Sequence, residues 1–219
     1  MRLHIPAIPH TITSQLYSHC AFTGKVLRFA PMMRSRGYQV YHYGVEKSEV
    51  EDTIDLLTRE EWQQLRIDSY RQLRPEADVE AALADERQFV GDLANVATPL
   101  YKEFNRRFRD ALLQRYQPGD IVCLPFGEAH REAIEGLQVL AVETGIGYPD
   151  SFLPFRIFES YAHKHWTCGR YGLPPHNYWF VCPNYYDADE WPCGYQPSKP
   201  IVGYFGRICH MAGRRRRGR

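Results

Sequence analysis

Apolar positions in this chain follow two spacings in turn, one typical of strands and one typical of helices. Short apolar, β-branched runs predict strands at Leu3–Ile8, Tyr38–Val45, Ile121–Leu124, Val139–Glu143 and Tyr178–Cys182. Apolar residues at helical spacing predict helices at Phe22–Arg36, Pro99–Tyr116, Glu128–Leu137 and Pro154–Gly169. Strands that alternate with helices predict an α/β fold, Rossmann-like, with a mostly parallel sheet and helices on both faces.

The clearest single element is the helix at 99–116. Leu100, Phe104, Phe108 and Leu112 fall on one stripe of it, and charged residues occupy the opposite side. A Pro-Gly-Asp turn follows the helix, and the next strand is apolar throughout, as is typical of a strand buried on both faces.

The pattern divides the chain into three parts. Residues 1–182 hold the alternating elements and form the predicted Rossmann-like domain. Within it, residues 46–98 are polar with scattered apolar positions, which predicts a helical insertion of two or three helices. Residues 183–198 contain three prolines and one glycine and are the predicted linker. Residues 199–219 begin with another apolar run, 201–205, and end in an arginine-rich tail.

Composition supports a folded chain. Of 219 residues, 44% are hydrophobic and 14% are aromatic, a combination that disordered proteins lack. No run reaches the roughly 18 apolar residues of a membrane helix, and the N-terminus carries no apolar leader segment. The six cysteines are scattered without a C-x-x-C pair, which favours neither a disulfide framework nor a zinc ribbon. These features predict a cytoplasmic protein without a membrane span.

The charge is unevenly distributed. The whole chain carries a formal net charge of +1, but five arginines lie within 214–219, so residues 1–213 carry −4. A mildly acidic body argues against a nucleic-acid-binding surface. The tail leaves two interpretations open: a patch for nucleic acid or an anionic surface, or the product of a shifted reading frame.

Ligands of open α/β sheets bind at the carboxyl ends of the strands, which selects three loops. The first, Ser18–Lys25, leads into a helix N-terminus, and His19 there could relay a proton or simply bond to the backbone. The second, Pro125–His130, holds Glu128 and His130 near a helix start, where an acidic side chain can also serve only the helix dipole. The third, Glu143–Tyr148, combines a carboxylate with two glycines and is the favoured site.

A metal site is not favoured. His163, His165 and Cys168 lie close in sequence, but on a helix His163 does not share a face with both of the others. We therefore expect no metal, and no Walker loop or Gly-x-Ser-x-Gly elbow occurs in the sequence.

Two late segments resemble one family. Pro183-Asn184-Tyr185-Tyr186-Asp187 follows a strand, and Gly203–Ile208 forms a Gly-x-x-Gly-Arg turn after the next apolar run. This order is similar to the hinge between the two domains of the large retaining group of GT-B glycosyltransferases, and the run 143–160 looks like a phage and bacterial subgroup. The resemblance implies that the chain holds the N-terminal domain and only the start of a truncated second domain.

The resemblance also implies a function. Such enzymes transfer a sugar from a nucleotide-sugar co-substrate to an acceptor, usually with retention, and need neither a catalytic metal nor another cofactor. Glu143 and His19 are then the candidate catalytic residues, and Gly206 and Arg207 match the donor-phosphate loop. The candidate acceptor-binding residues are Ser18, Thr23, Gly24, Lys25, Glu128, His130, Gly145, Gly147 and Tyr148.

The sequence departs from the family at three points. Pro125 stands where a histidine or acidic residue is common, Ala212 stands where a lysine is expected, and the paired-glutamate motif for the donor sugar does not occur. These departures predict that the chain alone is weakly active or inactive. The unpaired strand at 201–205 predicts self-association through a sheet edge. The alternative is a non-catalytic binding module whose arginine tail contacts nucleic acid or an anionic surface, which would show as salt-dependent affinity.

Overall fold

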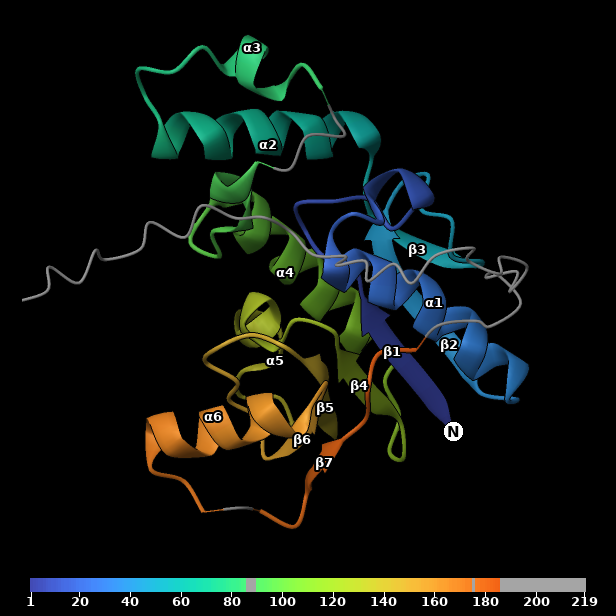
Figure 1. The fold of residues 1–219 in the computed structure, drawn as a ribbon. Coiled ribbons are helices and arrows are strands. Elements are labelled where there is room, and N and C mark those ends of the chain that lie inside the picture. The colour runs from blue at the N-terminus through green and yellow to red at the C-terminus, as the bar shows by residue number, and fades with distance from the viewer. Residues whose placement is uncertain (86–89, 175, 186–219) are drawn as a thin grey trace, which may run out of the picture. The chain divides into compact units, whose positions relative to one another are not determined.

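Seven parallel strands form one sheet in the computed structural model, which describes residues 1–85, 90–174 and 176–185 (Figure 1). All the described residues belong to one compact unit. The strands are β1 Arg2–Pro6, β2 Gln39–Val45, β3 Thr53–Leu57, β4 Ile121–Leu124, β5 Ala141–Ile146, β6 Phe155–Phe158 and β7 Trp179–Val181. Their order across the sheet is β3-β2-β1-β4-β5-β6-β7, and every neighbouring pair is parallel. The predicted α/β class and parallel sheet are therefore confirmed.

The helices occupy the connections between strands. The α-helices are α1 Ala21–Ser35, α2 Arg59–Leu73, α3 Val79–Leu83, α4 Pro99–Leu113, α5 Arg131–Ile134 and α6 Tyr161–Tyr171. Three short 3₁₀ segments are η1 Gln15–Tyr17, η2 Gly91–Ala94 and η3 Gly127–His130.

The sheet has a topological switch point between β1 and β4. Leu3 of β1 pairs with Val40 of β2 on one side and with Ile121 of β4 on the other. The chain proceeds outward from β1 toward β3 and then outward from β4 toward β7. The connections after β1 and β4 therefore diverge, which leaves a crevice at the carboxyl ends of these two strands.

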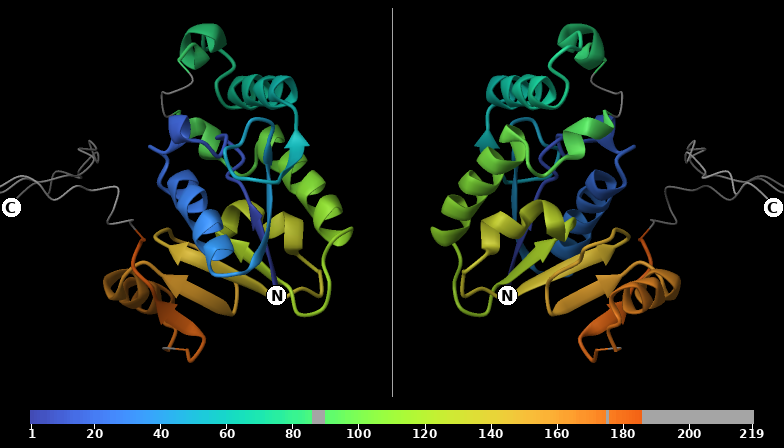
Figure 2. Two further views of the ribbon diagram at one scale, coloured as in Figure 1. Left: turned by 90° about the vertical axis from the view of Figure 1, so that its right-hand side faces the viewer. Right: turned by 90° about the vertical axis from the view of Figure 1, so that its left-hand side faces the viewer.

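Helices α1 and α4 lie on opposite faces of the sheet (Figure 2). The α1 face buries a cluster that includes Leu3, Ile5, Val26 and Ala30. The α4 face buries the larger core, in which the stripe Leu100, Phe104, Phe108 and Leu112 is fully buried against the sheet. The stripe predicted from the sequence is thus the centre of the main core.

Two predicted helical regions contain strands. Residues 53–57 of the expected helical insertion form β3, which pairs with β2 at the edge of the sheet. Residues 155–158, expected to begin a helix, form β6 between β5 and β7, and the helix starts only after Ser160, whose side chain accepts from the His163 N–H. Both segments are too short to show a strand period against the helical pattern beside them, and sheet pairing decides their conformation.

Two further elements have boundaries that differ from those predicted from the sequence. The expected helix at 128–137 is limited to η3 and α5, which end at Ile134. The expected strand at 139–143 is β5, which runs from Ala141 to Ile146. Glu143 therefore lies in the middle of a strand and not at its end.

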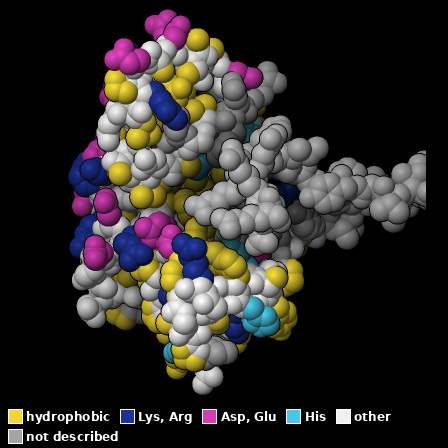
Figure 3. All heavy atoms as spheres, turned by 60° about the vertical axis from the view of Figure 1, so that its left-hand side comes forward, with side chains coloured by type: hydrophobic (Ala, Val, Ile, Leu, Met, Phe, Trp, Pro, Cys, Tyr) yellow, Lys and Arg dark blue, Asp and Glu magenta, His cyan; other side chains and the backbone are white. Residues whose placement is uncertain are grey.

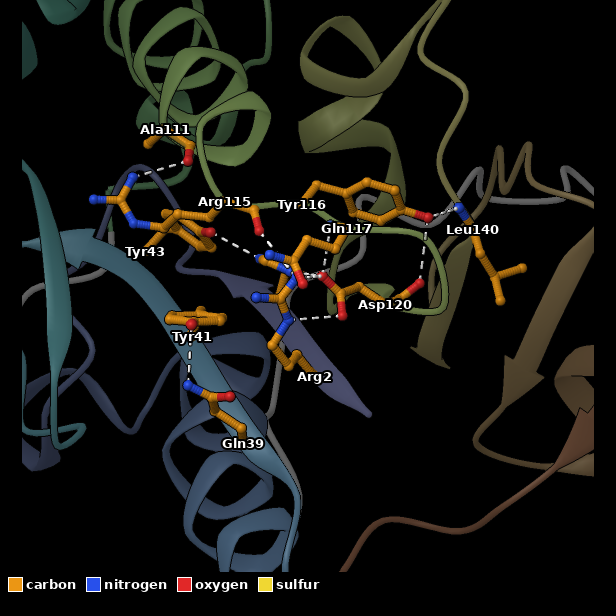
Figure 4. A network of polar contacts seen from close by, with 11 residues as sticks. Arg2, Gln39, Tyr41, Tyr43, Ala111, Arg115, Tyr116, Gln117, Asp120 and Leu140 are labelled. Atoms are coloured by element: carbon orange, nitrogen blue, oxygen red, sulfur yellow. Dashed lines mark hydrogen bonds and ion pairs between the residues drawn. The ribbon is translucent and has the colours of Figure 1, made fainter.

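A polar network closes the amino-terminal edge of the sheet (Figure 4). The guanidinium of Arg2 donates two hydrogen bonds to the Asp120 carboxylate, at 2.9 and 2.6 Å, and the Gln117 N–H donates a third at 2.8 Å. Burial opposes ionisation of Asp120, but these hydrogen bonds outweigh it and hold the pKa of the carboxyl below its usual range. The hydroxyl of Tyr116 accepts from the Leu140 N–H and donates to the Asp120 carbonyl, so the turn after α4 also fixes the entry to β5.

Helix α2 begins at a capping box. The Thr58 hydroxyl accepts from the Glu61 N–H at 3.2 Å, and the Glu61 carboxylate accepts from the Thr58 N–H at 2.9 Å. We expect Thr58→Ala to lower the free energy of unfolding by about 1 kcal/mol, measured by urea denaturation, because it removes the hydroxyl that accepts from the Glu61 N–H. Thr58→Ser keeps the hydroxyl and is expected to lie within about 0.5 kcal/mol of the original chain; equal losses in the two variants would contradict the cap.

Candidate functional site

A cavity of about 380 Å³ opens at the carboxyl ends of the strands, beside the switch point. Its floor is the α1 face of the sheet, and its walls are α1 and the segment after β7. The lining residues come from these elements, including β5, and from the loops after η1 and β4: Ile5, Ser18, Ala21, Gly24, Lys25, Val26, Arg28, Phe29, Met32, Pro125, Thr144, Gly145, Ile157, Cys182, Pro183, Asn184 and Tyr185. Its size falls within the range of small-molecule sites, about 300–1,000 Å³.

The first turn of α1 forms one wall of the cavity. No side chain caps the helix at Cys20, and the chain enters the helix directly from η1. Gly24 allows the loop after η1 to pack closely against the first turn of α1, because a Cβ at this position would lie 3.2 Å from the Ser18 carbonyl oxygen. A buried hydrogen bond between the hydroxyls of Thr11 and Thr23 ties the preceding loop to the helix.

Lys25 links this wall to two strands. Its ammonium forms an ion pair with Glu159, directly after β6, and donates to the Gly145 carbonyl at 2.8 Å. Burial lowers the pKa of Lys25 to about 8, and the nearby Cys20 acts in the opposite direction. A charged pair that is mostly buried at the edge of the cavity can orient a hydroxyl group and stabilise a partial charge on it.

Glu143 lies below the cavity and is fully buried. One carboxylate oxygen accepts from the Tyr148 hydroxyl at 3.2 Å, and the other accepts from the N–H groups of Phe152 and Leu153, both at 3.0 Å. Arg156 lies 3.8 Å away as the counter-ion. Burial raises the pKa of Glu143 to about 7, although these donors oppose the shift. These contacts give the Glu143 side chain a structural role, because they fix the loop between β5 and β6.

The structure brings four of the candidate residues together at the cavity: Ser18, Gly24, Lys25 and Gly145. His19 is exposed beside them and does not line it. The remaining candidates among the described residues lie behind or outside the lining: Thr23, Glu128, His130, Glu143, Gly147 and Tyr148. Gly206 and Arg207 lie outside the described residues, as does the expected strand at 201–205.

Several of the candidates outside the lining have structural partners. Glu128 forms an ion pair with Arg131 at 2.8 Å on the same turn. His130 is fully buried and hydrogen-bonds with Asn105 at 3.1 Å. Tyr148 accepts from the Gly127 N–H at 2.7 Å, which connects the loops after β4 and β5. These contacts position the loops around the cavity.

Part of the lining does not follow from the sequence pattern. Arg28, Phe29 and Met32 extend the cavity along α1, and Ile157 belongs to β6, which was expected to be helical. Phe29 packs against the core cluster on the α1 face, as its helical spacing predicts, and also lines the cavity. Helical spacing identifies an apolar position but does not show that it borders a cavity.

Nothing in the described ranges points to a metal or a membrane segment. No group of three His, Cys, Asp or Glu side chains there could hold a metal ion. His163 instead hydrogen-bonds to the Tyr148 carbonyl at 3.0 Å. Among the described helices, none is long and apolar enough to cross a bilayer.

Comparison with other proteins returned no relatives. The chain matches no family model, and neither the curated proteins nor the solved structures gave a match. Its function must therefore be argued from its own residues.

Charged side chains of both signs lie next to one another on the face shown in Figure 3. Ion pairs between charged side chains include those of Arg106 with Glu103 and Asp110, and of Arg107 with Glu61. Paired charges of this kind give no extended field of one sign, which phosphate-rich partners require.

Proposed function

We propose that residues 1–185 form the acceptor-side domain of a GT-B glycosyltransferase that transfers a sugar from a nucleotide-sugar. The acceptor occupies the cavity at the switch point. The donor contacts belong to the segment that contains Gly206 and Arg207.

One observation carries this proposal. The run Pro183-Asn184-Tyr185, on which the family resemblance rests, lines the same cavity as Ser18, Lys25 and Gly145. A sequence feature and three independently chosen loop residues thus meet at the place where open α/β sheets bind ligands. A seven-stranded parallel sheet supports many activities, so the fold alone would not support the proposal.

The residues of the cavity suggest a division of roles. Thr144 and the Gly145 backbone lie at the strand ends, where they can hydrogen-bond an acceptor hydroxyl. Lys25 and Glu159 form the charged pair next to it and hold that hydroxyl toward the donor side. Positioning of this kind contributes to the rate by orienting the reacting groups. Glu143 acts indirectly, by fixing the loop from Tyr148 to Leu153.

Saccharide binding by the chain of 219 residues tests the proposal. We expect saturation-transfer NMR with a panel of mono- and disaccharides to detect at least one ligand, with a Kd of about 1 mM. Ala21→Trp fills the cavity mouth from an exposed helix position and is expected to abolish the signal. Leu113→Trp changes an equally exposed helix position far from the cavity and is expected to leave the signal unchanged.

Two outcomes would overturn the proposal: no saccharide receives saturation, or Ala21→Trp binds as well as the original chain. In a parallel assay with a panel of nucleotide-sugars, we expect little or no transfer product. The sequence lacks the paired-glutamate motif of the family, and lost leaving-group stabilisation costs several kcal/mol of barrier.

A further inference from the structure

The cavity continues as a groove along α1. On this helix, all of the lining residues except Val26 recur at a spacing of three or four and form a single stripe. The stripe runs from Ala21 to Met32. Eleven residues of helix span about 16 Å, so the groove is roughly three helical turns long.

Polarity changes along this groove. Ser18, Lys25 and Thr144 lie at the end formed by the helix N-terminus and the strand ends. The far part is lined by Phe29 and Met32, and Arg28 between the two parts donates to the Gly24 carbonyl at 3.3 Å.

The floor of the groove is apolar as well. Ile5 of β1 and Ile157 of β6 line it from the sheet. Ile157 pairs in register with Phe180 of β7, so the two side chains lie on the same face. Phe180 is 60% exposed, which extends the apolar surface beyond the cavity itself. Among the described helices, α1 is the one that borders this part of the face.

We propose that the groove binds the apolar chain of an amphiphilic acceptor, with the reacting hydroxyl at the polar end beside Lys25 and Thr144. This assignment of the substrate class rests on the proposed function. A saccharide group can hydrogen-bond at the polar end, whereas the floor and far wall offer mainly aliphatic and aromatic surface. An unbranched chain with one polar end matches the groove in both polarity and length.

Binding of primary alcohols to the chain of 219 residues tests this directly and needs no knowledge of the sugar. We would titrate 1-hexanol, 1-octanol and 1-decanol by calorimetry. Affinity is expected to rise three- to fourfold for each added CH₂, hence about tenfold from hexanol to octanol. In parallel, the ¹³C-methyl NMR signal of Met32 is expected to shift during the octanol titration, which reports binding at the groove without any substitution.

Substitution locates the site. Met32→Glu places a carboxylate in the apolar part of the groove and is expected to weaken octanol binding at least tenfold. Met32→Leu keeps the apolar surface and is expected to retain it. Leu113→Glu makes the same chemical change at a helix position that is 56% exposed and outside the groove, and is expected to have no effect.

The outcomes separate the two proposals. Equal affinity for the three alcohols, or an unshifted Met32 signal, overturns the acceptor class even if saccharides bind. Chain-length-dependent binding that Met32→Glu abolishes supports the apolar groove. If the alcohols bind in this way but no saccharide in the panel binds, only the proposed sugar transfer is overturned.

Discussion

The free energy of unfolding is expected to fall by about 4 kcal/mol when the pH is lowered from 7 to 5. Three buried histidines are the cause. Burial lowers the pKa of His10 to about 4 and the pKa values of His42 and His130 to about 3, from an ordinary value near 6.5. The unfolded chain therefore binds protons between pH 6.5 and about 3.5 that the folded chain does not, and stability is lost as the pH falls through this range.

The contacts explain why these rings stay neutral. The His42 Nδ1–H donates to the Thr53 hydroxyl, which in turn donates to the Val50 carbonyl, so the other ring nitrogen accepts from Thr13. The His130 Nδ1–H donates to the Asn105 side-chain oxygen, and its Nε2 has no hydrogen-bond partner among the described residues. A proton on Nε2 would bury an uncompensated charge.

Glu143 works in the opposite direction. Its folded pKa of about 7 exceeds the ordinary value of 4.5, so its neutral form gains stability as the pH falls from 7 to 5. Each histidine costs about 2 kcal/mol over this range and Glu143 returns about 2 kcal/mol, which leaves the net loss given above. This loss is a large part of the 5–15 kcal/mol that stabilises a typical domain.

Urea denaturation at pH 7, 6 and 5 measures the effect. His130→Gln removes one titrating ring and is expected to reduce the loss between pH 7 and 5 by about 2 kcal/mol, whatever its effect at pH 7. His165→Gln changes an exposed histidine and serves as the matched control, with no expected change in the pH dependence. A pH-independent stability in the original chain would show that these rings are not buried as described.

The second large effect is expected at Gly127. A Cβ there would lie 1.9 Å from a carboxylate oxygen of Glu143 and 2.6 Å from its Cδ and Cγ atoms. The carboxylate cannot move aside without losing its bonds to Tyr148, Phe152 and Leu153. We expect Gly127→Ala to lower the free energy of unfolding by about 3 kcal/mol or more, since overpacking and broken buried hydrogen bonds add.

A second glycine provides the control. Gly169 lies within α6, and nothing is found within 4 Å of its ideal Cβ. Gly169→Ala is therefore expected to raise the free energy of unfolding by about 0.8 kcal/mol. In the double variant Gly127→Ala, Glu143→Ala the clash is gone, so its loss is expected to be smaller than the sum of the two single losses. A Gly127→Ala chain within 0.5 kcal/mol of the original would contradict the packing of this network.

The sequence by itself determined the α/β class, the parallel sheet and the main core. These follow from local periodicity, which is strong in long elements such as α4 and in short apolar strands such as β4. The sequence also located the loops after β1 and β4, because chain order alone fixes which loops follow strands. The third predicted loop, Glu143–Tyr148, lies mostly within β5. It did not reveal β3 or β6, because each spans only four or five residues and its conformation depends on pairing with neighbouring strands.

Only the tertiary structure decided which residues form the site. Glu143 and Thr144 are neighbours in sequence, but in β5 their side chains point to opposite faces, and only Thr144 reaches the cavity. Lys25 and Glu159 are 134 residues apart and meet because α1 crosses the sheet near the end of β6. Met32 lines the cavity together with Cys182 and Tyr185, which follow β7 far along the chain. Side-chain direction and the meeting of segments that are distant in sequence are properties of the assembled fold, and local sequence patterns do not contain them.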